Sequence, residues 1–258
     1  MLLVVDIGNT NTVLGLFEGE QLVRDWRVTT AASYTADEVS LLLHNLLALG
    51  GVERAQVTAV AASSVVPPVV PAWEEGIHRY LGVEALFVGP GVKTGLPVRY
   101  ENPKEVGADR IVNAVAALAR YGGPAIVIDF GTATTFDALS AQGEYLGGAI
   151  CPGLGISVEA LVNRTAKLPR VELVRPAKVI GKTTVTSIQA GVIYGAVGQT
   201  REIIRRMAAE LGGAPKVIAT GGLARVIAGD LPEIEVVDQG LTLEGLRLIH
   251  ERNRADNA

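Results

Sequence analysis

The chain has 258 residues, of which 48% are hydrophobic and 19% charged, and its formal net charge is −4. This composition is typical of a globular protein with one large domain or two modest ones, and it excludes a disordered chain. The negative charge disfavours nucleic acid and anionic membranes as partners, because both would repel the protein.

The start of the chain is not typical of a signal peptide, because its apolar run stops at Asp6 without a preceding basic region. The long uncharged stretches, residues 55–73 and 183–200, are broken by proline or by polar residues and glycine, so neither predicts a membrane span. A single cysteine, Cys151, cannot form an internal disulfide. We therefore expect a cytoplasmic protein.

The first half predicts strands, two short turns and helices in alternation. Thr35 and Glu38 form a capping-box pattern at a helix start. The expected strands are residues 2–5, 13–17, 22–28, 57–62 and 85–88, and the expected helices begin at residues 35 and 67 and span 111–119.

The second half repeats this order. The expected strands are residues 125–128, 136–139, 145–150, 216–219 and 235–237, and the expected helices span 187–211, begin after 222, and span 242–253. The hydroxyl cluster at residues 183–187 is typical of a helix N-cap.

An internal repeat explains this order. An apolar strand followed by Asp-x-Gly-x-x-x-Thr occurs at Asp6 and again at Asp129, each time leading into a hairpin. The repeat predicts an α/β protein of two tandem RNase H-like domains with mixed sheets and an interdomain cleft. We expect domains at residues 1–121 and 122–258, with the last helix able to pack on the first domain.

Both aspartates of the repeat stand where α/β proteins bind ligands, at the carboxyl ends of strands. Glycine-containing turns let a phosphate approach the backbone, but a carboxylate beside a phosphate requires a cation between them. A single Asp-x-Gly could be an ordinary turn. Two copies in matching contexts favour a nucleotide site.

Two further segments are candidates for the site, although each also fits an ordinary structural role. Asp109 begins an apolar helix, where it could stabilise the helix dipole with Arg110 as its surface partner, or act as a general base. Gly221 and Gly222 follow a strand, a geometry that admits a phosphorylated ligand but also suits any tight turn. The three histidines lack metal-ligand spacing, and Cys151 lacks a catalytic pattern.

Taken together, these motifs resemble the acetate and sugar kinase, Hsp70 and actin superfamily, and within it the type III pantothenate kinases over nearly the whole chain. The segments that carry the resemblance are residues 6–12, 89–95, 100–110, 129–135, 181–184 and 189–191. Thr183 departs from the pattern, since that family more often has asparagine there.

The resemblance implies a role for each matching residue. Asp109 would be the catalytic base. The ATP-binding residues would be Asp6, Ile7, Gly8, Asn9, Thr10, Asn11, Thr12, Val13, Thr132, Gly221 and Gly222. The pantothenate-binding residues would be Tyr100, Gly107, Ala108, Asp109, Arg110 and Thr184.

The resemblance also implies the reaction, the cofactors and the partners. ATP would phosphorylate the primary hydroxyl of pantothenate to 4'-phosphopantothenate, the first step of coenzyme A biosynthesis. Mg²⁺ would lie near Asp6, held mostly through water, and K⁺ or NH₄⁺ near Asp129. The protein would be a homodimer with part of the pantothenate pocket at the subunit contact.

Two alternatives stay open. One is another small-molecule kinase of the superfamily, against which the segment from Tyr100 to Arg110 argues. The other is a non-catalytic nucleotide-binding transcription accessory factor. Such a factor would not need a catalytic base, so the presence of Asp6, Asp109 and Asp129 together argues against it. The net charge of −4 also argues against a factor that binds DNA.

Overall fold

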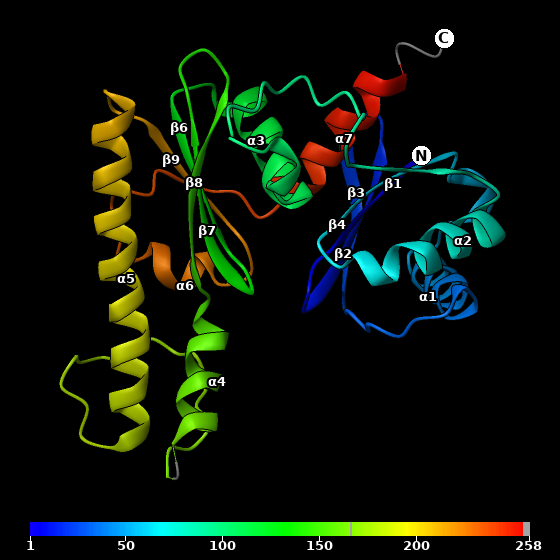
Figure 1. Ribbon diagram of the computed structural model, residues 1–258. Coiled ribbons are helices and arrows are strands. Elements are labelled where there is room, and N and C mark those ends of the chain that lie inside the picture. Colours follow the sequence, from blue (N-terminus) through cyan, green and yellow to red (C-terminus); the bar gives the residue numbers. More distant parts are fainter. Residues whose placement is uncertain (166, 255–258) are drawn as a thin grey trace. The chain divides into compact units, whose positions relative to one another are not determined.

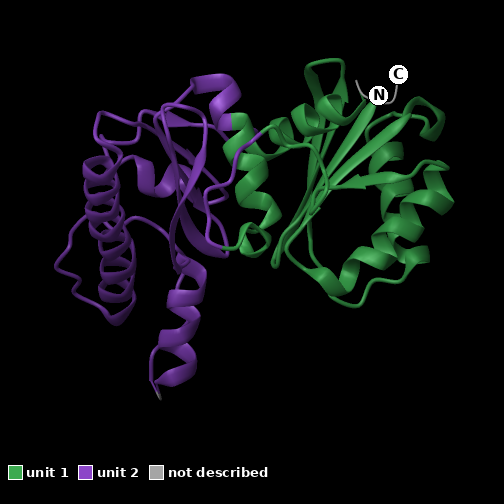
Figure 2. Cartoon of the chain, turned by 45° about the horizontal axis from the view of Figure 1, so that its top comes forward, with its two compact units in different colours: residues 1–95, 102–116, 241–258 green, residues 96–101, 117–240 purple. Residues whose placement is uncertain are grey.

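A computed structural model describes residues 1–165 and 167–254 (Figure 1). The chain forms two compact units (Figure 2). The first contains Met1–Gly95, Asn102–Ala116 and the stretch that begins at Leu241. The second contains Leu96–Glu101 and Ala117–Gly240. The last helix thus belongs to the first unit, and the domain boundary expected after residue 121 stays a prediction.

The first unit is built on a five-stranded sheet in the order β3-β2-β1-β4-β5. Its elements are β1 (Leu2–Ile7), β2 (Asn11–Glu18), β3 (Gln21–Thr29), α1 (Ala36–Leu49), β4 (Ala59–Ser64), α2 (Val70–Leu81), β5 (Ala85–Phe87), the start of α3 (Ala108–Tyr121) and α7 (Leu241–Arg254). Strands β1, β2 and β3 are antiparallel neighbours, whereas β4 and β5 continue the sheet in parallel.

The two faces of this sheet are covered by different helices. Leu3, Val5 and Ile7 of β1 pack into one core cluster with side chains of α1 and α2. The alternate residues face the other way, where a Cβ at Gly15 would lie 3.1 Å from the Val4 side chain and 2.9 Å from Leu243 of α7. Asp6 shares the α7 face, because it follows Val4 by two residues.

The second unit repeats the first strand for strand. Its sheet order, β10-β9-β6-β7-β8, pairs β6 with an antiparallel β7 and a parallel β9, as β1 pairs with β2 and β4. Its elements are β6 (Ala125–Phe130), β7 (Ala133–Leu139), β8 (Tyr145–Pro152), α4 (Leu154–Arg164), α5 (Thr184–Leu211), β9 (Lys216–Thr220), α6 (Ala224–Ala228) and β10 (Val236–Val237). The internal repeat predicted from the two aspartates is confirmed.

Capping residues in the sequence predicted the starts of α1 and α5. The capping box of Thr35 and Glu38 is present, and Thr183 caps α5. The helix expected from residue 67 begins there as a short 3-10 helix, Pro67–Val69, that leads into α2. The 3-10 helices Arg54–Gln56 and Pro103–Glu105 were not expected, nor was α4. Helix α4 starts at a glycine with no side-chain cap, so its start carries no capping signal.

The described residues contain no helix that combines the length and the apolar character needed to cross a bilayer.

Candidate active site

The turn after β1 is held in shape by its own backbone and by Thr30. The Gly8 N–H donates to the Asn11 carbonyl over 3.1 Å, and a Cβ at Gly8 would lie 2.9 Å from that oxygen. The Thr30 hydroxyl donates to the Gly8 carbonyl over 2.7 Å and lies 2.9 Å from the Thr12 hydroxyl. The turn is therefore preorganised, with Asn9 and Thr10 exposed at its tip.

Asp6 stands beside this turn in a poorly solvated position. The Ser63 hydroxyl, from the paired position on β4, donates to Asp6 Oδ1 over 2.7 Å. Burial raises the pKa of Asp6 to about 7; the Ser63 hydrogen bond lowers it, the charge of Asp109 raises it and the charge of Arg27 lowers it. A carboxylate that is so costly to ionise gains from a nearby cation.

Asp109 lies in the first turn of α3. Its Oδ1 accepts the backbone N–H of Arg110 over 2.8 Å, and a Cβ at Gly107 would lie 2.6 Å from the same oxygen. Burial raises the pKa of Asp109, and the N–H and guanidinium of Arg110 partly offset that rise. Arg110 is only 7% exposed, so its interpretation as a surface partner is wrong.

The first unit thus brings Asp6 and Asp109 within electrostatic range of each other, since each ionised group would affect the other. Both residues are half-buried, so they keep some access to solvent. A half-buried carboxylate with a raised pKa is typical of general bases and cation-linked sites.

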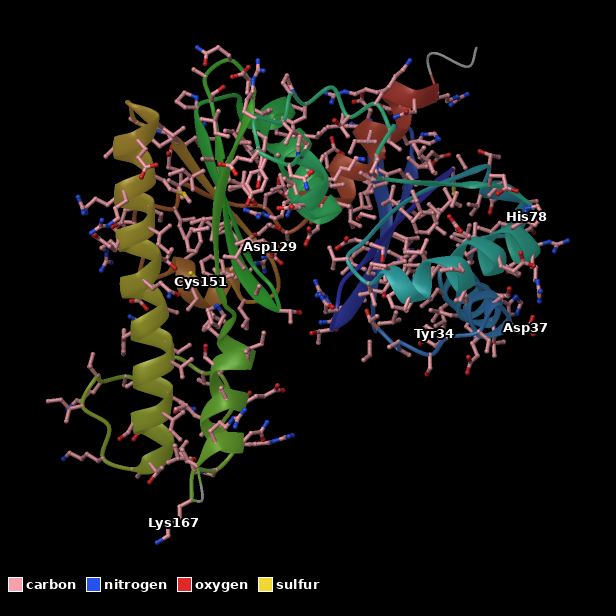
Figure 3. The ribbon with its side chains drawn as sticks, viewed as in Figure 1. Tyr34, Asp37, His78, Asp129, Cys151 and Lys167 are labelled. Atoms are coloured by element: carbon pink, nitrogen blue, oxygen red, sulfur yellow. The ribbon has the colours of Figure 1, made fainter. Side chains whose placement is uncertain are left out.

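In the second unit Asp129 is the last residue but one of β6 (Figure 3), as Asp6 is of β1. Its Oδ1 lies against the backbone of two turns: a Cβ at Gly221 would come within 2.3 Å of it, and one at Gly131 within 3.3 Å. Gly221 also has a φ of 91°, which favours glycine. Gly222 follows in the same turn before α6.

Thr132 lies in the turn between β6 and β7, exposed to solvent. A Cβ at Gly153 would come within 2.1 Å of the Thr132 carbonyl oxygen. The start of α4 therefore packs directly on the turn between β6 and β7 that contains Thr132.

Tyr100 and Thr184 lie in two other parts of the second unit. The Tyr100 ring lies 6.4 Å, centroid to centroid, from the ring of Tyr145, whose hydroxyl donates to the buried Asp137 over 2.7 Å. Thr184, at the start of α5, borders a cavity of about 650 Å³ between α4 and α5 that Leu161 and Ile188 also line. The sequence-predicted residues therefore form separate groups within the units.

Sequence reasoning missed three supporting residues: Ser63, Thr30 and Gly153. Ser63 does carry a sequence signal, because Ser63 and Ser64 are the last two residues of the strand next to β1. Thr30 and Gly153 act through contacts that depend on strand pairing and helix docking, so the surrounding sequence holds no comparable signal.

A metal ion near Asp6 would need further coordinating atoms from a bound ligand or from water. Among the residues described, no group of three or more His, Cys, Asp or Glu side chains is placed to hold a metal ion. The donors at Asp6 fit a divalent ion that takes its other ligands from phosphate oxygens and water, which is how Mg²⁺ is commonly bound beside nucleotides.

Solved structures with the same fold cover nearly the whole chain. A Campylobacter jejuni protein named as a Baf family transcriptional activator matches with a TM-score of 0.63 at 18% identity, over 98% of this chain and 99% of the other. The ethanolamine utilization protein EutJ from Carboxydothermus hydrogenoformans matches with a TM-score of 0.57 at 18% identity, over 96% and 89%. At such identities the likeness concerns the fold alone, and it confirms the expected α/β fold of two similar domains.

Sequence comparison is more specific. The family model for type III pantothenate kinase matches residues 2–206. The type III pantothenate kinase of Anaeromyxobacter sp. (strain Fw109-5) is 59% identical over 98% of this chain and 100% of its own length. That of Geobacter sulfurreducens is 56% identical over the same shares. The chain belongs to the type III pantothenate kinase family, a family of enzymes whose kinase activity implies ATP and a divalent metal ion.

Proposed function

We propose that this chain transfers the γ-phosphoryl group of ATP to the primary hydroxyl of pantothenate. The product is 4'-phosphopantothenate, and the reaction is the first step of coenzyme A biosynthesis. The observation that carries the proposal is the pair of half-buried carboxylates, Asp6 and Asp109, beside a preorganised glycine turn in a chain of this family.

Asp109 is the base of the proposed reaction. Its carboxylate accepts the proton of the pantothenate hydroxyl while that oxygen bonds to the γ-phosphorus, and the bond from the γ-phosphorus to the bridging oxygen breaks to release ADP. Burial, which raises the pKa of Asp109, strengthens it as a proton acceptor. Gly107 leaves room for the carboxylate, and Arg110 limits the pKa rise.

The nucleotide-binding residues in this proposal are residues 6–13 together with Thr132, Gly221 and Gly222. The closed turn after Asp6 and the tight approach of Gly221 to Asp129 support such roles, because phosphates bind where glycine lets them reach the main chain.

Two kinds of cation are proposed, Mg²⁺ near Asp6, mostly through water, and K⁺ or NH₄⁺ near Asp129. When bound, they would neutralise phosphate charge. The raised pKa of Asp6 supports the first, because a cation would favour ionisation of this carboxylate. Asp129 supports the second through its position against the backbone of Gly131 and Gly221.

The acceptor, pantothenate, is proposed to contact Tyr100, Gly107, Ala108, Asp109, Arg110 and Thr184. Family membership further supports a cytoplasmic homodimer as a proposal, in line with the single cysteine. The alternatives, another small-molecule kinase or a transcription accessory factor, are not favoured, because relatives more than half identical over the full length are pantothenate kinases.

A coupled assay with purified protein, ATP, Mg²⁺ and pantothenate tests the proposal. We expect turnover that requires pantothenate and that is higher with K⁺ or NH₄⁺ than with Na⁺ alone. Asp109→Asn keeps the shape of the side chain and removes the base, so turnover should fall by about 10² to 10⁴-fold. Near-normal turnover of Asp109→Asn would show that the base lies elsewhere.

A further inference from the structure

Arg27 lies in the same transverse row of the first sheet as Asp6. Asp6 on β1 pairs with Val13 on β2, and Val13 pairs with Arg27 on β3. Residues aligned across neighbouring strands point to the same face of a sheet. Strands are spaced about 4.8 Å apart, which puts the Cα atoms of Asp6 and Arg27 about 10 Å apart, within reach of a long side chain.

The charge of Arg27 therefore lies on the face of the first sheet that carries Asp6. Arg27 is exposed, and within residues 1–165 and 167–254 its guanidinium forms no hydrogen bond or ion pair. The five N–H groups of the guanidinium are therefore available to a ligand that binds beside Asp6.

The internal repeat shows that the fold does not require a cation here. In the second unit Asp129 pairs with Thr135, and Thr135 pairs with Ile150. Ile150 thus occupies the position equivalent to Arg27, and it is 64% exposed. Because the same strand arrangement forms with an apolar residue at this place, the positive charge of Arg27 points to a role in the ligand site of the first unit.

We propose that Arg27 binds the terminal phosphate oxygens of ATP on the face of the first sheet that carries Asp6. This inference rests on the proposed function, since it concerns the same nucleotide. An arginine suits this position because its planar fork can donate two parallel hydrogen bonds to a phosphate. Its charge would also offset the repulsion between Asp6 and the triphosphate.

Calorimetric titration of the full chain with Mg²⁺-ATP and with Mg²⁺-ADP, without pantothenate, tests this contact. Arg27→Gln should weaken ATP binding by about 10- to 100-fold and ADP binding much less, since charge-assisted hydrogen bonds to the γ-phosphate are lost. Arg27→Lys keeps the charge without the fork and should fall between Arg27→Gln and the parent chain.

Arg24→Gln is the matched control. Arg24 lies on the same strand and is exposed, but it pairs with Leu16, whose side chain belongs to the core under α1 and α2, so it points to the other face. The ATP affinity of the Arg24→Gln chain should therefore equal that of the parent chain.

The inference would be overturned if the Arg27→Gln chain, folded by circular dichroism, lost affinity for ATP and ADP equally, or lost affinity for neither. If Arg27→Gln does not fold, the Arg27→Lys chain serves instead: a preference for ATP over ADP equal to that of the parent chain would also overturn the inference. A parent chain that binds neither nucleotide would instead contradict the proposed function, and the inference with it.

Discussion

The Thr242 hydroxyl donates a hydrogen bond to Asn113 Oδ1 over 2.7 Å, which ties α7 to α3 one helical turn beyond Asp109. Asn113 is only 1% exposed, so the bond is shielded from water. Next to it the two helices touch: a Cβ at Gly245 would lie 2.1 Å from the Val112 carbonyl oxygen. The closing helix therefore sets the position of the helix that carries the proposed base.

Gly245→Ala tests this contact between helices. The added methyl group requires α3 and α7 to separate, so we expect a loss of about 1 to 3 kcal/mol in the free energy of unfolding. Because Asp109 moves with α3, kcat should fall more than the KM for ATP changes. Urea unfolding and steady-state kinetics measure both effects.

Gly198→Ala on α5 is the control for that variant. No heavy atom outside its own helix lies within 4 Å of a Cβ at Gly198, so alanine should stabilise the helix by roughly 0.5 to 1 kcal/mol and leave kcat unchanged. If Gly245→Ala behaved like Gly198→Ala, α7 would have no part in positioning Asp109.

Asp6→Asn should stabilise the chain at alkaline pH while abolishing its kinase activity. The pKa of Asp6 is about 7 in the folded chain and 3.8 when unperturbed. Between these values the folded chain holds a proton that the unfolded chain lacks, so its stability falls as pH rises. The loss is complete above pH 7, and asparagine avoids it because it cannot ionise.

Urea unfolding without nucleotide or divalent metal measures this effect. The stability advantage of Asp6→Asn over the parent chain should be small near pH 4 and grow up to about pH 8. An advantage that does not change with pH would show that Asp6 is readily ionised in the folded protein.

Ser63→Ala should move the acidic limb of the pH–activity profile. The Ser63 hydrogen bond lowers the pKa of Asp6, so its loss raises that pKa and activity declines at a higher pH than in the parent chain. Ser64→Ala is the control, because Ser64 accepts the Val66 N–H instead and should leave the profile in place. Superimposable profiles for all three chains would contradict the role of Ser63.

Gly221→Ala should impair the proposed cation site at Asp129 and the response to K⁺. Alanine there carries the strain of a positive φ and pushes its Cβ against Asp129 Oδ1. Gly212→Ala, with a φ of 71° and no atom within 4 Å of its Cβ, carries the strain alone. Both variants should lose stability, but only Gly221→Ala should lose the K⁺ dependence of kcat.

Local sequence patterns predicted the two aspartate turns, the capping box at Thr35 and the N-cap at Thr183, because each depends on residues within a few positions of one another. The repeated turn then predicted two similar sheets. Helix α4 was missed because it has no capping side chain, and β4 starts two residues later than expected.

The sequence by itself determined the repeat, the α/β class and the resemblance to the kinase family, since these follow from motifs that are continuous in the chain. Only the tertiary structure decided that Ser63 bonds to Asp6, that Arg27 shares its row, and that Thr242 holds the helix of Asp109. Strand register and helix docking create these neighbours, and both are set by the packing of segments far apart in sequence, which no single segment encodes.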